Sequence, residues 1–157
     1  MTKKYVEQWE RTKRFMTRFE ALSSGVNHTQ ASDNYEDDMQ SFFMHCYHLK
    51  DWIKNDPYCA AWQSVEQFIQ ADPHLPICAD LCNALKHLTR TTNRSQENPQ
   101  FGGSAIKLDI QEGGVKASVQ IEMSFIVTTT KHGNIDALNL ARNCMDSWKQ
   151  FIASNDP

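Results

Sequence analysis

The chain has 157 residues, a formal net charge of −3 and 40% apolar residues. This length fits one domain, which we place at residues 1–157, and the apolar content excludes a disordered chain. The near balance of acidic and basic residues does not by itself indicate a nucleic-acid binder. No apolar run approaches the ~20 residues that span a bilayer, and the N-terminus has no apolar stretch typical of a secretory signal. We therefore expect a cytoplasmic protein that does not associate with a membrane.

The first part of the chain predicts two amphipathic helices. Apolar residues recur every three or four positions from Lys3 to about Leu22, and the Ser-Ser-Gly sequence at 23–25 ends this helix. The second helix is expected to begin at Asp33, with Glu36 as its capping-box partner, and to run to about Asn55.

Prolines mark the next two helices. Asp56 followed by Pro57 is typical of an N-cap and a first helical residue, and predicts a third helix to about Ala71. A fourth helix is expected from near Pro76 to Leu88. Residues 89–104 are polar and predict a surface loop.

The hydrophobic period then changes from helical to alternating. Alternation over 106–110 and 115–127, with a turn at 112–114, predicts a β-hairpin with one buried face. Asn134 is expected to cap a last helix. An isolated hairpin is marginal in water, so the helices or a partner chain must cover its apolar face.

The predicted fold class is therefore α+β, mainly α. We expect an antiparallel bundle of four helices within residues 1–95, then a β-hairpin over about 104–130 and a C-terminal helix over about 134–154.

Two predicted helices carry strips of polar residues. Positions on the second helix are three apart, and those on the fourth have i, i+3, i+7 spacing, so each set shares a strip of its helix. The strips are His45, His48 and Asp51 on the second helix and Asp80, Asn83 and His87 on the fourth. If these two helices are neighbours, the strips meet and form one cluster of histidines, carboxylates and an amide.

Three interpretations of this cluster remain open. It could be a structural hydrogen-bond network that fixes helix register. Imidazole and carboxylate groups on facing helices could instead bind a metal ion, with His45, His48, Asp51 and His87 as ligands, although no specific metal signature is present.

The third interpretation is acid–base chemistry without a metal or other cofactor. An imidazole titrates near neutral pH, so His87 would act as the acid or base, with Asn83 and Asp80 orienting it. His48 completes the set of candidate catalytic residues.

Basic residues follow the same spacing toward the end of the fourth helix. Lys86, Arg90 and Arg94 are four residues apart and could bind a phosphate-bearing substrate. The alternative is that they complement the helix dipole and are otherwise solvated.

The five cysteines have irregular spacing without a zinc or iron–sulfur signature. We expect buried, free thiols in a reducing compartment. Cys46 lies between two histidines, but a thiol within an apolar helix stripe is usually inert.

The segments His45–Trp52 (HCYHLKDW) and Asp80–His87 (DLCNALKH) resemble those of small uncharacterised bacterial proteins. In general form, residues 33–95 are similar to HEPN-type helical domains. That resemblance implies a homodimeric helical bundle in a toxin–antitoxin or phage-defence system, with metal-independent ribonuclease activity. His87 matches the histidine of the HEPN motif and Asn83 a polar position before it. The motif's arginine is absent.

Three functions follow as hypotheses. The protein could be a HEPN-like enzyme acting on RNA, a metal-binding helical bundle, or a non-catalytic domain that binds a bacterial partner protein.

Overall fold

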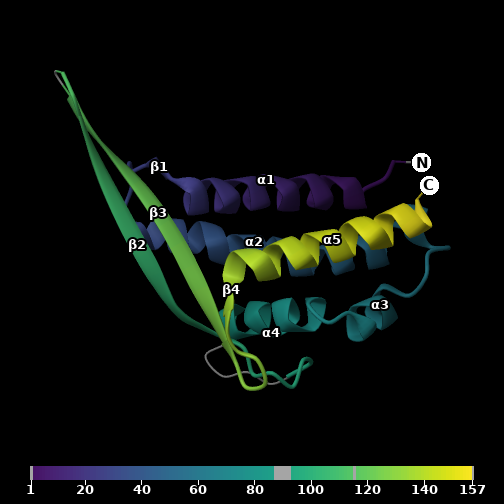
Figure 1. Cartoon of the computed structure of the whole chain (residues 1–157). Coiled ribbons are helices and arrows are strands. Elements are labelled where there is room, and N and C mark those ends of the chain that lie inside the picture. The colour runs from purple at the N-terminus through teal and green to yellow at the C-terminus, as the bar shows by residue number, and fades with distance from the viewer. Residues whose placement is uncertain (1, 87–92, 115, 157) are drawn as a thin grey trace.

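The computed structural model describes residues 2–86, 93–114 and 116–156 (Figure 1). Within these residues the elements in chain order are α1 (Tyr5–Ser24), β1 (Val26–Asn27), α2 (Ser32–Asn55), the 3-10 turn η1 (Pro57–Cys59), α3 (Val65–Ala71), α4 (Leu75–Lys86), β2 (Gln100–Gly113), β3 (Lys116–Thr129), β4 (Gly133–Asp136) and α5 (Ala137–Asn155). The fold is mixed α+β and mainly helical, as the sequence predicts.

The long helices lie side by side, and the sheet crosses one end of them (Figure 1). Helix α2 packs against both α1 and α4, while α5 contacts all three. On the sheet, α1 and α5 contact β3, and α4 contacts β2. The contact between α2 and α4 brings together the two helices that carry the predicted polar strips.

One connected core joins the helices to the sheet. Its fully buried side chains include Phe19 of α1, Phe43 of α2, Leu81 of α4 and Trp148 of α5, and Phe125 of β3 also belongs to it. Removing apolar side chains from water is the main force that stabilises a fold. The shared core therefore holds the four helices and β3 in fixed relative positions.

The sheet is antiparallel, with β3 at its centre. Strand β2 pairs with one edge of β3, and the short strands β1 and β4 pair with the other edge. Within the described residues no strand pairs with the outer edge of β2. The sequence expectation missed β1 and β4, because strands this short are defined by their partner and not by their own alternation.

The two rows of the hairpin's apolar face have different environments. On β3 the row is buried, and it includes Ile121 and Met123. The residues paired with these two, Leu108 and Ile106, are exposed. The prediction of one buried face is therefore confirmed for β3 and wrong for the Ile106–Ile110 part of β2, which the helices do not cover.

Two boundaries in the first half of the chain differ from the sequence expectation. Helix α2 begins at Ser32, and its N-cap residue Ala31 makes no side-chain cap. The predicted Asp33–Glu36 capping box is therefore wrong, because Asp33 already lies inside the first turn. There its charge complements the helix dipole.

The predicted third helix is broken. Asp56 caps only the turn η1, where its side chain accepts a hydrogen bond from Tyr58 N at 3.1 Å. A separate helix, α3, then begins after Ser64, whose hydroxyl accepts a hydrogen bond from Gln67 N. This second cap is the physical reason for the break.

The last helix begins later than predicted. Residues around Asn134 form β4, and Asp136 caps α5 by accepting a hydrogen bond from Asn139 N at 2.8 Å. The expected loop over 89–104 likewise ends early, because β2 begins at Gln100.

Among the described residues, no helix has the length and apolar character needed to cross a bilayer.

Candidate functional site

His48 and Lys86 meet where α2 packs on α4. The Nζ atom of Lys86 lies 2.5 Å from Nε2 of His48. An ammonium group can only donate, so Nε2 accepts and the imidazole proton lies on Nδ1. Burial, followed by the charge of Lys86, lowers the pKa of His48. The pair therefore joins a neutral imidazole to a cation at neutral pH.

The surrounding sequence explains why these two side chains meet. Cys46 and Leu49 flank His48 and are fully buried, as is Cys82, one turn before Lys86. These apolar neighbours hold the two helices together, and the polar side chains lie at the margin of the contact. His48 is half-buried, whereas Lys86 is the exposed last residue of α4.

A second group of charges lies around Tyr47. Lys50 Nζ is 3.1 Å from Glu66 Oε1 and 3.2 Å from Asp51 Oδ1, and Arg94 Nη1 is 3.1 Å from Glu66 Oε2. Both cations also face the Tyr47 ring, at 5.1 Å and 5.8 Å from its centre. Burial opposes ionisation of Glu66, but hydrogen bonds from Lys50 and Arg94 lower its pKa. Fixed carboxylates thus position two cations on the α2–α4 side of the molecule.

Asp80 holds the chain segment that carries Arg94. Its carboxylate is fully buried and accepts hydrogen bonds from Arg94 N and Ser95 N, both at 2.8 Å, and from Ser95 Oγ at 2.6 Å. These contacts give Asp80 a role in positioning this segment, which sequence spacing did not indicate.

His45 lies on the other side of α2. Its Nδ1 is 3.2 Å from Gln8 Nε2, and its ring stacks on Phe15 with centres 4.6 Å apart. Residues three positions apart on a helix are offset by about 60° around its axis. His45 therefore faces α1, whereas His48 faces α4. The structure therefore separates these two histidines.

The remaining predicted residues are placed in part. Asn83 is half-buried on α4, one turn before Lys86. His87 and Arg90 lie outside the described residues. Their predicted roles stay predictions.

Three thiols gather in the core, a grouping the sequence did not predict. Cys46 of α2, Cys78 of α4 and Cys144 of α5 are all fully buried, and their Sγ atoms lie within 4.8 Å of one another. Among the described residues, this is the one group of three or more His, Cys, Asp or Glu side chains whose geometry could hold a metal ion. All five cysteines are free and buried, which confirms that part of the sequence analysis.

The thiols influence one another's ionisation. Burial opposes a thiolate at Cys46, but hydrogen bonds from Cys144 and Cys78 outweigh it and lower the pKa of Cys46. Hydrogen bonding to its two thiol neighbours raises the pKa of Cys78. The indole nitrogen of Trp148 is buried and has no hydrogen-bond partner within the described chain.

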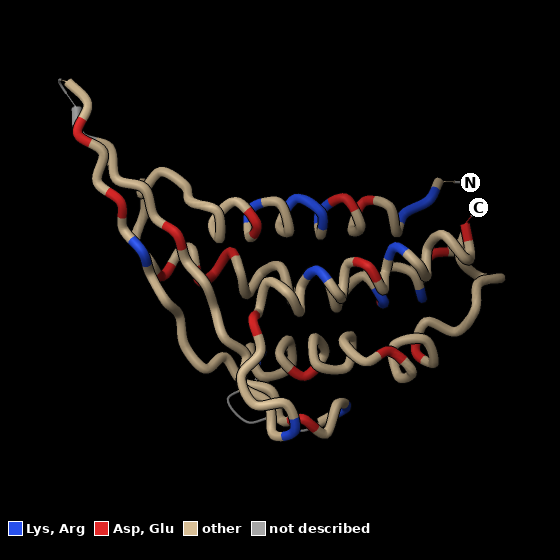
Figure 2. Tube along the Cα trace, in the orientation of Figure 1, with Lys and Arg blue, Asp and Glu red and all other residues tan. Residues whose placement is uncertain are grey.

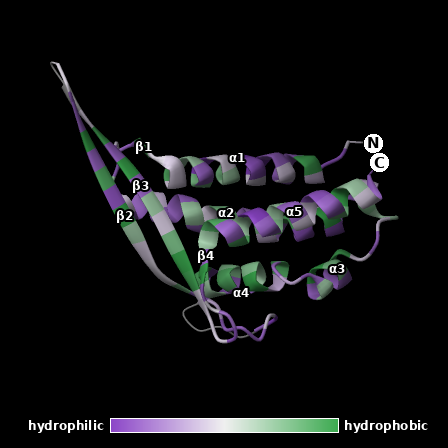
Figure 3. Ribbon diagram, in the orientation of Figure 1, coloured by the Kyte–Doolittle hydropathy of each residue, from purple (hydrophilic) through white to green (hydrophobic). Residues whose placement is uncertain are grey.

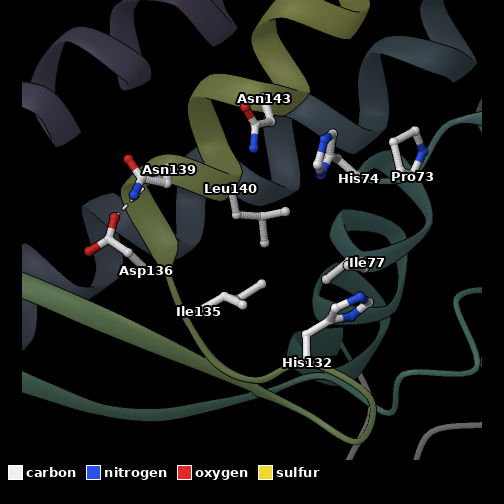
Figure 4. A pocket seen from close by; sticks show the side chains of 9 residues that line it. All are labelled: Pro73, His74, Ile77, His132, Ile135, Asp136, Asn139, Leu140 and Asn143. Carbon is white, nitrogen blue, oxygen red and sulfur yellow. Dashed lines mark hydrogen bonds between the residues drawn. The ribbon is translucent and has the colours of Figure 1, made fainter.

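A cavity of about 420 Å³ lies elsewhere, between α4, the β3–β4 turn and α5 (Figure 4). It combines apolar side chains such as Ile77 and Leu140 with two histidines, His74 and His132. His132 Nδ1 is 3.0 Å from Glu97 Oε1, so one of its nitrogens is already engaged. None of the residues predicted for the site lines this cavity.

Several basic residues of α1 are neutralised by ion pairs. Arg11 pairs with Glu7 at 3.0 Å and Lys13 with Glu10 at 2.5 Å, so blue and red alternate along α1 in Figure 2. These pairs reduce the unpaired positive charge that α1 offers to a phosphate.

Comparison of the chain with protein-family models, with curated proteins and with solved structures gave no match. Function is therefore inferred from the geometry of the site.

Proposed function

We propose that this protein is a HEPN-like enzyme that cleaves RNA by metal-independent acid–base chemistry at the α2–α4 contact. The observation that carries the proposal is the 2.5 Å contact between Lys86 Nζ and His48 Nε2. A neutral imidazole can accept a proton at neutral pH, and an ammonium group can bind a phosphate oxygen.

The proposed reaction uses the 2′-hydroxyl of RNA as its nucleophile. Phosphate competes with the imidazole for the Lys86 ammonium group, which frees the lone pair of His48 Nε2. His48 then takes the 2′-hydroxyl proton while the 2′-oxygen bonds to phosphorus and the bond to the 5′-oxygen breaks. His87, the histidine that matches the HEPN motif, supplies a proton to the leaving 5′-oxygen. The products are a 2′,3′-cyclic phosphate and a 5′-hydroxyl.

Other residues would hold the substrate. Lys50 and Arg94 are ordered by Glu66 and could exchange that carboxylate for an RNA phosphate. Asp80 acts as a positioning residue, because it fixes the backbone at Arg94. Arg90 would add a further phosphate contact, as the sequence predicts. HEPN-like chemistry also implies a toxin–antitoxin or phage-defence role.

The test is cleavage of mixed-sequence RNA in EDTA. Wild type should cleave RNA and leave DNA of the same sequence intact, because DNA has no 2′-hydroxyl. His48→Ala should lose activity, while His45→Ala should keep it. His45 is a matched control on the same helix, with a pKa also lowered by burial but with Gln8 and Phe15 as its neighbours. No cleavage by pure wild type, or equal loss in both variants, would contradict the proposal.

A second candidate function is binding of a soft metal ion by Cys46, Cys78 and Cys144. Sγ atoms within 4.8 Å of one another suit trigonal thiolate coordination, and thiolates favour Cu⁺. Zn²⁺ is nearly always four-coordinate, and the described residues offer no fourth ligand in this group. The indole N–H of Trp148 could donate to a bound thiolate.

Refolding reduced protein with Cu⁺ in the presence of a chromophoric chelator tests this candidate. Refolding is needed because the thiols are fully buried. Cys78→Ala should abolish binding, and Cys59→Ala should keep it, since Cys59 is a buried thiol outside the cluster. Equal binding by both variants, or no binding by wild type, would exclude a three-thiol site.

A further inference from the structure

Strand β2 has a long outer edge that pairs with no strand in the described part of the chain, and it carries an exposed apolar row. Ile106, Leu108 and Ile110 are 50%, 57% and 66% exposed, although they lie on the same sheet face as the buried row of β3. Green and purple alternate along β2 in Figure 3, on a hairpin that extends past the end of α1. Natural proteins rarely leave such an edge open, because it readily pairs with another strand.

The sequence of this edge is complementary to itself. In an antiparallel pair of two β2 strands, directly opposite residues lie on the same face. If Leu108 faces Leu108 of the second copy, then Ile106 faces Ile110 and Lys107 faces Asp109. Apolar residues then meet apolar residues on one face, and opposite charges meet on the other.

Neighbouring registers lack this match. A pair centred on Lys107 or on Asp109 would place two like charges directly opposite each other. A pair centred on Ile106 would oppose Lys107 with Ala105, and one centred on Ile110 would oppose Leu108 with Glu112. The register centred on Leu108 therefore satisfies both faces of the strand.

We propose that two copies of this chain associate through β2, in antiparallel register centred on Leu108, to form one continuous sheet. A two-fold axis perpendicular to the sheet keeps the helices of both copies on the same side, and such self-complementary contacts are typical of symmetric dimers. The two exposed apolar rows then form one band between the two helical layers. This inference is independent of the proposed action on RNA, because no residue of the α2–α4 site takes part.

Charge exchange at the interface tests the register. Sedimentation velocity should give a species of twice the 18.1 kDa chain mass for wild type. Lys107→Asp and Asp109→Lys should each raise the dimer dissociation constant roughly tenfold, since each creates two like-charge pairs. The double variant should restore the wild-type constant. Lys131→Asp, on an exposed turn, controls for net charge.

Cross-linking gives a second, position-specific measurement. Leu108→Cys should form a disulfide-linked dimer under mild oxidation, because directly opposite strand residues lie within disulfide range. Ile106→Cys is the matched control, since in this register the two copies of residue 106 would be about 14 Å apart. The native thiols are buried and do not interfere.

Circular dichroism of every variant separates dimer loss from misfolding. A wild-type monomer at all concentrations would overturn the inference. Failure of the double charge variant to recover, or equal cross-linking at 106 and 108, would also overturn it.

Discussion

The ammonium group of Lys86 donates to the Nε2 atom of His48 across 2.5 Å at the contact between α4 and α2. Two residues separated by 38 positions in the chain thus meet at this contact. The first prediction concerns this pair.

Removal of Lys86 should raise the pKa of His48. Burial lowers this pKa most and the Lys86 charge lowers it further, so Lys86→Met removes one of the causes. NMR titration of the His48 ring protons measures the change directly, and a shift to lower pKa would contradict the assignment. In the RNA assay, the acid limb of the rate profile should move to higher pH, because a base of higher pKa is neutral only at higher pH.

Asp80 should be required for stability. Asp80→Ala leaves two backbone N–H groups and one hydroxyl without their buried acceptor, which should lower the free energy of unfolding by about 3 kcal/mol. Urea denaturation measures this loss. Asp146→Ala, which removes an exposed carboxylate, should change it by less than about 0.5 kcal/mol. Similar losses in the two variants would show that Asp80 does not hold the segment around Arg94.

The two ends of the chain should contribute to acid stability. Asp156 is 2.8 Å from Lys3 Nζ and accepts hydrogen bonds from Tyr5 and Tyr58. The hydrogen bond from Lys3, followed by those from the two tyrosines, lowers the pKa of Asp156 from 3.8 to about 2.

A carboxyl group with a lowered pKa in the folded state stabilises the fold above its ordinary pKa, and loses that effect as the pH falls toward the folded value. Wild-type stability should therefore decline between about pH 4 and pH 2 in part through Asp156. Asp156→Asn should be less stable at pH 7 and show a shallower decline in that window. An unchanged decline in thermal melts would contradict this role.

The five thiols should react only when the protein unfolds. All five are buried, so a thiol reagent should label native protein slowly and label five cysteines in denaturant. Rapid labelling of the native protein would mean that the core around Cys46 opens readily. In denaturant, the reagent should label one cysteine fewer in the Cys59→Ala variant than in wild type.

Local sequence patterns predicted much of the fold. The stripes of α1 and α2 and the alternation of β2 and β3 were identified, because each element carries its own period. The exposure of Leu108 could not be predicted, since alternation shows which face is apolar but not what covers it. The broken third helix depended on a second cap at Ser64, which the spacing of apolar residues did not reveal.

The candidate site was predicted less completely. Spacing placed His48 and Lys86 on their helices but could not pair them, because their contact depends on how α2 and α4 pack. The grouping of Cys46, Cys78 and Cys144 was missed for the same reason, since each thiol comes from a different helix. Asp80 was assigned to catalysis because sequence spacing cannot reveal hydrogen bonds to Arg94 and Ser95.

The most direct test of the central claim is the rate of RNA cleavage in EDTA by wild type, His48→Ala and His45→Ala at equal folded concentration. We predict that His48→Ala lowers the rate by about 10²- to 10⁴-fold, the usual contribution of an acid–base group, and that His45→Ala stays near wild type. Equal rates for His48→Ala and wild type would contradict the account.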